Sequence, residues 1–228
     1  MIYSISDLHL DYTENKSMNI FGDNWKDHNK KIFNNWQNII NNNDYVLIAG
    51  DISWQIRMEE AYIDLIQIDK LPGKKIMIKG NHDFWWDSIS KLRNLKLKTI
   101  SFIQNDSIDI NDFSICGTRA WLDKEDSDFK KNDLKIFERE LIRLKLSLES
   151  CKRNKIICML HYPPFNKDGN TNEFADLMSK YKVDTCIYGH LHSDGLKMVV
   201  EGSIGGVNYI CTSCDYIDFK PILIKEIL

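Results

Sequence analysis

The sequence of 228 residues contains no stretch that would mark a boundary between two domains. Proline occurs 4 times and glycine 11 times, and neither gathers with serine into a linker. No block of like charges interrupts the chain. Because a chain of this length can form one large domain, we expect a single domain that spans residues 1–228.

The sequence also lacks a long hydrophobic run and a basic stretch. No apolar run approaches the roughly 20 residues that a transmembrane helix needs. The first residues already resemble a core strand, so we expect no signal peptide. The formal net charge is −3 and lysines are interspersed with acids, so no nucleic-acid-binding surface is evident. We therefore expect a cytoplasmic protein, and the sequence leaves its oligomeric state open.

The six cysteines do not form a disulfide or redox pattern. Four of them lie in or beside apolar strand-like runs, where a reduced cysteine behaves as a small core residue. Cys211 and Cys214 have the spacing of a redox or zinc pair, but there is no second such pair and this one does not open a helix after a strand. We interpret the cysteines as buried structural thiols.

Short apolar runs alternate with helical patterns over the first part of the chain. The runs at 1–6, 45–49 and 75–79 predict buried strands, and apolar residues at helical spacing predict helices over 24–41 and 57–68. Three successive strand and helix units predict a right-handed βαβ arrangement whose strand ends meet at one edge. Ligands bind beyond the carboxyl ends of the strands in such sheets.

The second part of the chain contains shorter pieces. Three of them, at 98–104, 107–110 and 113–116, predict short strands that pair antiparallel. The charged segment 123–133 predicts a loop. The remaining expected elements are helices over 85–95, 134–148 and 173–181, strands over 156–160 and 183–188, and further strands of a second sheet after Gly195.

Polar side chains follow these strands at the points where the strands end. The set comprises Asp7, His9, Asp51, Asn81, His82, His161, His190 and His192. Each alone could be an ordinary turn residue, but five of the six histidines belong to the set, and we interpret the sixth, His28, as structural. Because unpaired charges at buried strand ends are costly, a metal cluster would satisfy these groups.

On these residues the sequence resembles the calcineurin-like metallophosphoesterase superfamily. The motif blocks occur in the family's order, as Asp7-Leu8-His9, Gly50-Asp51, Gly80-Asn81-His82-Asp83, His161 and Gly189-His190-Leu191-His192. The resemblance runs from residue 2 to at least residue 192. It implies an α/β fold, a four-layer α/β/β/α sandwich of two mixed sheets flanked by helices.

The resemblance also implies a dinuclear metal centre. One ion would be held by Asp7, His9 and His192, the other by Asn81, His161 and His190, with Asp51 bridging the two. Manganese, iron or zinc suits these ligands, and we favour manganese. Two ions about 4 Å apart can lower the pKa of a shared water. The implied reaction is therefore attack of a metal-bridging hydroxide on a phosphoester.

Three further residues are candidates for catalysis. The resemblance implies that His82 assists the leaving group by proton donation or electrostatic support, and Asp83 could orient it. We add Arg119, because a guanidinium can hold phosphate oxygens at two points, although it could instead pair with an acid in 123–128. The tryptophans Trp85, Trp86 and Trp121 could wall a substrate pocket, or Trp85 and Trp86 could anchor a helix.

The chain departs from two branches of the superfamily. Ile52-Ser53-Trp54-Gln55 stands where the protein Ser/Thr phosphatases carry an aspartate and an arginine, and Trp54 stands where the purple acid phosphatases need a tyrosine ligand. We therefore predict a hydrolase of the bacterial-type phosphodiesterase or small-molecule phosphatase branch. The alternatives are a catalytically silent binding scaffold and an enzyme that cleaves a pyrophosphate linkage in a nucleotide or lipid precursor.

Overall fold

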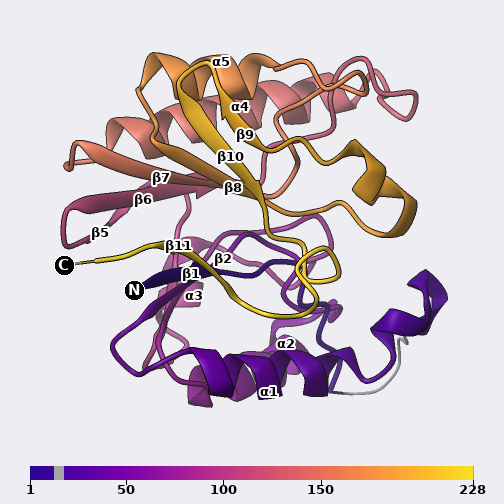
Figure 1. The fold of residues 1–228 in the computed structure, drawn as a ribbon, viewed down its shortest axis with the longest axis vertical. Helices are drawn as coiled ribbons and strands as arrows, with labels where there is room; N and C mark the ends of the chain where they lie inside the picture. The colour runs from indigo at the N-terminus through magenta and orange to yellow at the C-terminus, as the bar shows by residue number, and fades with distance from the viewer. Residues whose placement is uncertain (13–17, 228) are drawn as a thin grey trace.

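The structure is a computed structural model that describes residues 1–12 and 18–227. Two sheets face each other in the middle of the molecule, and helices cover their outer faces (Figure 1). The layers therefore follow the order α/β/β/α, which confirms the predicted sandwich of two mixed sheets.

The first sheet has the strand order β11-β1-β2-β3-β4. Its parallel strands are β1 (Ile2–Ser4), β2 (Tyr45–Ile48), β3 (Lys74–Met77) and β4 (Ile100–Phe102), and β11 (Ile222–Lys225) runs antiparallel to β1. The outer face is covered by α1 (His28–Ile39) and α2 (Met58–Lys70). Helices on one face and the second sheet on the other explain why these strands are apolar on both sides.

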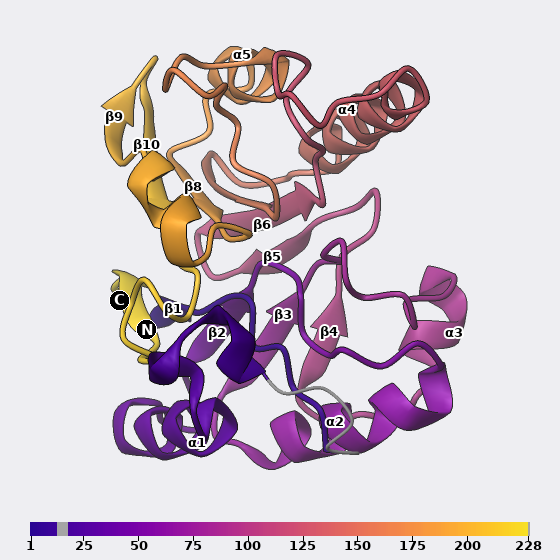
Figure 2. The ribbon, with the colours of Figure 1, turned by 90° about the vertical axis from the view of Figure 1, so that its right-hand side faces the viewer.

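The second sheet has the strand order β5-β6-β7-β8-β10-β9. Its parallel strands are β6 (Phe113–Thr118), β7 (Lys155–Leu160), β8 (Thr185–Tyr188) and β10 (Val207–Cys211), with β5 (Ile108–Ile110) and β9 (Gly202–Ile204) antiparallel at the edges. The helices α4 (Asp133–Glu149) and α5 (Glu173–Lys180) cover its outer face (Figure 2).

Apolar side chains from both sheets meet between them. Ile76 of the first sheet and Ile157 and Ile187 of the second belong to one buried cluster. Separate clusters lie under α1 and α2 and under α4 and α5. Each fully buried side chain of this size contributes about 1.5–3 kcal/mol relative to an exposed one. The inter-sheet cluster therefore fixes how the carboxyl ends of the two sets of parallel strands face each other.

Several elements differ from the sequence-based expectation. β4 pairs in parallel with β3, so of the three strands expected to pair antiparallel only β5 and β6 do so. β11 returns to the first sheet instead of extending the second. The helix expected over 85–95 is shortened to α3 (Ile89–Arg93), because Trp85 and Trp86 are buried in the core under the first sheet.

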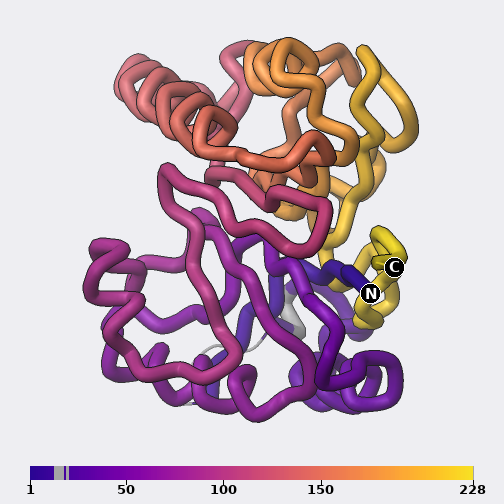
Figure 3. Tube along the Cα trace, turned by 90° about the vertical axis from the view of Figure 1, so that its left-hand side faces the viewer, coloured from indigo at the N-terminus to yellow at the C-terminus, as the bar shows by residue number. Residues whose placement is uncertain are grey.

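Three short 3-10 helices complete the described elements, η1 (Met18–Phe21), η2 (Asp23–Trp25) and η3 (Ser193–Met198). The two chain ends lie close together, since Ile2 pairs with Lys225 (Figure 3). All six cysteines are free, and all but the half-buried Cys151 are buried. Within residues 1–12 and 18–227, no helix has the length and apolar character needed to cross a membrane.

Candidate metal centre

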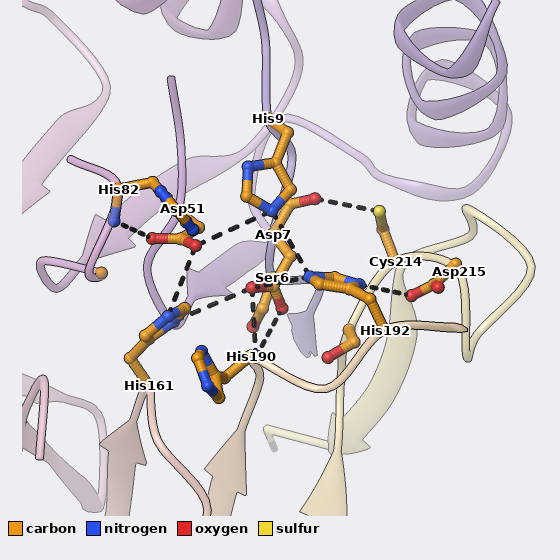
Figure 4. A network of polar contacts seen from close by, with 12 residues as sticks. Ser6, Asp7, His9, Asp51, His82, His161, His190, His192, Cys214 and Asp215 are labelled. Carbon is orange, nitrogen blue, oxygen red and sulfur yellow. Dashed lines mark hydrogen bonds and ion pairs between the residues drawn. The ribbon is translucent and has the colours of Figure 1, made fainter. Parts of the chain in front are cut away.

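Six of the predicted metal ligands converge at the facing carboxyl ends of the parallel strands (Figure 4). The seventh, Asn81, contacts His161 and His190 there. Asp7 and His9 follow β1, Asp51 follows β2, and Asn81 follows β3. The second sheet supplies the other three ligands, His161 after β7 and His190 and His192 after β8. The site therefore lies between the two sheets, and neither sheet provides it alone.

The backbone at four of these ligands adopts the left-handed conformation. The φ angles are 60° at Asp7, 45° at His9, 51° at Asp51 and 74° at His190. Residues with a side chain seldom adopt this conformation, and such strain gathers at functional sites where surrounding contacts hold it in place. The sharp turn after each strand directs the polar side chain toward the opposite sheet.

The first group of ligands surrounds a common point. His192 Nε2 lies 3.4 Å from both His9 Nε2 and Asp7 Oδ1. Donor atoms of Asp7, His9 and His192 all lie within 4.8 Å of one another. Donors about 2.1 Å from a tetrahedral ion lie roughly 3.4 Å apart, so this spacing fits a cation held between them.

The second group gathers around Asn81. Its Oδ1 is 2.5 Å from His161 Nε2 and 3.0 Å from His190 Nδ1. Asp51 Oδ2 lies between the groups, 3.7 Å from His9 Nε2 and 3.5 Å from His161 Nε2. Imidazole, carboxylate and amide oxygen together form a donor set for a divalent metal ion, so the residues fit the predicted metals.

Two of the ring nitrogens that face away from this point have partners of their own, whereas His9 Nδ1 is buried without a hydrogen-bond partner among the described residues. His192 Nδ1 is 2.8 Å from Asp215 Oδ1, and His161 Nδ1 is 2.9 Å from the Ala49 carbonyl oxygen. Metal-binding histidines commonly donate their second N–H in this way, which fixes the ring orientation. His28 contacts the His9 carbonyl oxygen at 3.1 Å, as expected of a structural residue.

Burial sets the protonation of most of these histidines. Burial lowers the pKa of His161 to about 4 and holds those of His9 and His190 well below the ordinary value. Their neutral rings are the form that binds a metal. Burial would also lower the pKa of His192, but Asp7 and Asp215 outweigh it and raise that pKa to about 10.

The two carboxylates at the centre behave differently. Burial raises the pKa of Asp51 well above its ordinary value, and the nearby charges of Asp83 and Asp7 raise it further. Burial would raise the pKa of Asp7 as well, but the neighbouring histidines, above all His192, lower it. Asp51 therefore lies among too few positive charges, and a bound cation would supply them.

His82 and Asp83 adjoin the metal ligands but face different surroundings. The His82 ring lines the cavity at the ligands, and its backbone N–H donates to Asp51 Oδ1 at 2.8 Å. Asp83 is buried, and its carboxylate accepts hydrogen bonds from the backbone N–H groups of Ile52 and Gly80 at 2.9 and 2.8 Å. These contacts tie the loop after β2 to the loop after β3.

Arg119 does not reach this centre. Its guanidinium packs 4.3 Å from the centre of the Trp121 ring, and its Nη2 lies 3.6 Å from Glu140 Oε1. The expected contact of Arg119 with a phosphoester stays a prediction, although Arg119 is not among the described residues that line the cavity at the predicted ligands. Its pairing with an acid in 123–128 is wrong, because its partner is Glu140. The physical reason is Glu140, a carboxylate only 1% exposed that requires positive charge beside it.

The cavity at the predicted ligands has a volume of about 460 Å³. Its apolar walls are Trp54, Phe21 and Leu191, not the expected set of Trp85, Trp86 and Trp121. Trp54 stacks on His9 with ring centres 4.7 Å apart. Trp85 and Trp86 instead anchor the segment before α3 through indole hydrogen bonds to Asp83 and Gln104.

Solved structures with the same fold are found at low sequence identity. A protein of unknown function from Aquifex aeolicus (AQ665) aligns over 97% of this chain and 94% of its own, with a TM-score of 0.52 and 20% identity. The phosphopantetheinyl hydrolase PptH from Mycobacterium tuberculosis aligns over 91% of this chain and 86% of its own, with a TM-score of 0.57 and 15% identity.

Sequence comparison gives both a relative and a family. An uncharacterized protein from Methanocaldococcus jannaschii is 31% identical over 83 residues, and the match covers 36% of this chain and 46% of that protein, under half its length. The family model for calcineurin-like phosphoesterases matches residues 1–194. The chain therefore belongs to the calcineurin-like phosphoesterase family.

Proposed function

We propose that this protein hydrolyses a small-molecule phosphodiester or phosphomonoester at a centre of two divalent ions, with manganese as the favoured metal. Asp7, His9 and His192 would hold one ion, and Asn81, His161 and His190 the other. Asp51 would bridge the two ions.

The position of Asp51 is the observation that carries the proposal. One oxygen, Oδ2, lies 3.7 Å from a histidine nitrogen of the first group and 3.5 Å from one of the second. The other oxygen accepts the His82 N–H at 2.8 Å, which holds the carboxylate in this orientation. A carboxylate can share its oxygens between two cations, so this placement supports a bridging role.

The bound ions would supply Lewis acidity and lower the pKa of a nearby water. The chain supplies the geometry. Asp215 and the Ala49 carbonyl orient the rings of His192 and His161. Asp83 ties together the loops that carry Asp51 and Asn81. We therefore assign Asp83 a positioning role.

His82 is the residue we propose as proton donor to the leaving oxygen. Its ring lines the cavity and lies 4.3 Å from the Trp54 ring and 5.8 Å from the His9 ring, measured between ring centres. His82 therefore lies close to the proposed ligands Asn81 and Asp51 without being one of them. Trp54 would limit the water that reaches the leaving group.

The test compares hydrolysis of bis-p-nitrophenyl phosphate and p-nitrophenyl phosphate by chelator-treated protein before and after Mn²⁺ is added back. We expect turnover only with the metal, and the ratio of the two rates assigns the preference for diesters or monoesters. Asp51→Asn in the same assay should nearly abolish turnover. If both substrates stay unreacted while bound Mn²⁺ is demonstrated, the binding scaffold becomes the better reading.

A further inference from the structure

A second, much smaller cavity of about 30 Å³ lies beside the proposed metal centre, at the carboxyl ends of β3, β4 and β6 and next to α4. Its lining includes Lys79, Gln104, Thr118, Arg119, Glu140 and Arg143. No described residue lines both this cavity and the one at the metal ligands. The volume is far below the range for small-molecule sites, about 300–1,000 Å³, so the cavity can admit only a small ion or one end of a larger molecule.

The lining carries an excess of positive charge. Three cationic side chains, Lys79, Arg119 and Arg143, face one acid, Glu140, among the described lining residues. The Glu140 carboxylate already has hydrogen-bond partners, since it accepts hydrogen bonds from Thr118 Oγ1 at 2.5 Å and from Arg143 Nη1 at 2.8 Å. The exposed Arg139 adds a further contact to Glu140 at 3.7 Å from outside the cavity. The cavity is therefore electropositive after its own acid is paired.

Hydrogen-bond donors remain unused in this cavity. Arg119 Nε is buried without a hydrogen-bond partner among the described residues, and Arg119 Nη2 is too far from Glu140 for a normal hydrogen bond. Gln104 Oε1 accepts a hydrogen bond from the Trp86 indole N–H at 2.9 Å. The NH₂ group of Gln104 can therefore donate to another acceptor. A buried guanidinium N–H without an acceptor is costly, which favours an occupant that accepts hydrogen bonds.

We propose that this cavity binds a tetrahedral oxyanion, either free inorganic phosphate or the phosphoryl group of a larger metabolite. Arg119 and Lys79 hold its oxygens, with Gln104 as a neutral donor, because guanidinium and ammonium groups are the usual partners of phosphate. Arg119 thus binds an oxyanion, but away from the metal ligands.

The bound anion would contact one segment that carries a proposed metal ligand and another whose backbone is hydrogen-bonded to a proposed ligand. Lys79 stands two residues before Asn81. The Arg119 carbonyl accepts the backbone N–H groups of His161 and Tyr162 at 3.2 and 2.9 Å. Phosphate could also bind at the metal centre itself, so the test must separate the two sites.

Equilibrium binding of radiolabelled inorganic phosphate is measured on Mn²⁺-loaded and on chelator-treated protein. We expect one phosphate site to remain after the metal is removed. Lys79→Gln and Arg119→Gln should each weaken this metal-independent binding at least about tenfold, since each removes a charge-assisted hydrogen bond. Arg139→Gln is the matched control, because it removes a charge near Glu140 without changing the cavity lining, and it should stay within about twofold of wild type.

Competing ions complete the test. Sulfate should displace phosphate from the metal-independent site, while chloride at equal ionic strength should not. Glycerol 3-phosphate separates the two sources, because equal affinity indicates a metabolite phosphoryl group and weaker affinity indicates the free ion. The proposal is overturned if phosphate binding disappears with the metal, if chloride competes as well as sulfate, or if both cavity variants bind phosphate like wild type.

Discussion

At the scale of single residues, His82 lines the same open cavity as four of the proposed metal ligands, His9, Asp51, His190 and His192. We expect His82→Ala to slow hydrolysis of an alkyl phosphoester by about 10²–10⁴-fold, the usual contribution of general acid catalysis. A p-nitrophenyl ester should be affected much less, because its leaving group departs without a proton. Turnover numbers for both substrates are measured with Mn²⁺ in excess.

The comparison between leaving groups decides the role of His82. An equal loss for both esters would argue against proton donation and would favour a role in shaping the site, since the His82 backbone N–H also donates to Asp51. His82→Gln serves as a second variant, because it keeps a hydrogen-bond donor but cannot act as an acid near neutral pH.

Asp215 offers a test of metal binding that does not change a ligand. Its carboxylate is 2.8 Å from His192 Nδ1, and the side chain is 1% exposed. We expect Asp215→Asn to weaken Mn²⁺ binding about 10–100-fold, as is usual when the partner of a metal-binding histidine is removed. Titration against a competing chelator measures the affinity.

Asp194→Asn is the matched control for Asp215→Asn. Asp194 is 95% exposed, pairs with Lys197 and lies in η3, two residues after His192. Its removal should leave the Mn²⁺ affinity unchanged within about twofold, because an exposed ion pair contributes little. Equal losses in both variants would mean that the overall charge of this face, not the contact with His192, sets the affinity.

The residues differ in how far the sequence could identify them. The seven proposed ligands were found because each follows a short apolar strand, a local pattern. Asp215 follows β10 in the same way, so that signal was present but was not used. Trp54 and Glu140 could not be found locally, since their roles depend on His9 and Arg119, which are distant in the chain.

At the scale of elements, the loop after β8 passes directly over the end of β1. A Cβ atom on Gly189 would lie 2.4 Å from Asp7 Oδ2 and 2.9 Å from Ser6 Cβ. We expect Gly189→Ala to displace Asp7 and to destabilise the protein by about 1–3 kcal/mol, the usual cost of inserting atoms into a packed site. Urea unfolding and Mn²⁺ titration measure the two effects.

Gly195→Ala is the control within the same loop. Its added Cβ would meet Leu191 side-chain atoms at 3.8 Å or more, which is ordinary van der Waals contact. This variant should bind Mn²⁺ like wild type. If Gly189→Ala also retains full affinity, the loop after β8 can shift away from β1, and the close approach is not needed to form the site.

The positions of the elements followed from hydrophobic periodicity more closely than their pairing did. Each expected buried strand up to residue 188 has a counterpart within a few residues of its predicted bounds. The parallel pairing of β4 and the return of β11 to the first sheet are set by tertiary contacts, which short apolar runs do not encode. α3 is shorter than its pattern because Trp85 and Trp86 gain more from burial than from a helical turn.

At the scale of the whole molecule, the proposed centre joins the two sheets. Asp7, His9, Asp51 and Asn81 belong to loops of the first sheet, and His161, His190 and His192 to loops of the second. The inter-sheet cluster also draws on both. We propose on these grounds that residues 1–228 unfold as a single domain.

Metal removal tests whether the proposed centre stabilises the two sheets as one folding unit. An ion present at 100 times its dissociation constant adds about 2.7 kcal/mol to the free energy of unfolding. For a chain of this size, chelation should therefore lower the midpoint of thermal unfolding by about 5–10 °C, within a single transition. Asp51→Asn should show a much smaller decrease, because its binding is already weakened at both positions. Two separate transitions in the metal-free protein would mean that each half folds independently. An unchanged midpoint with bound Mn²⁺ would mean that the unfolded chain binds the ion as tightly as the folded protein does.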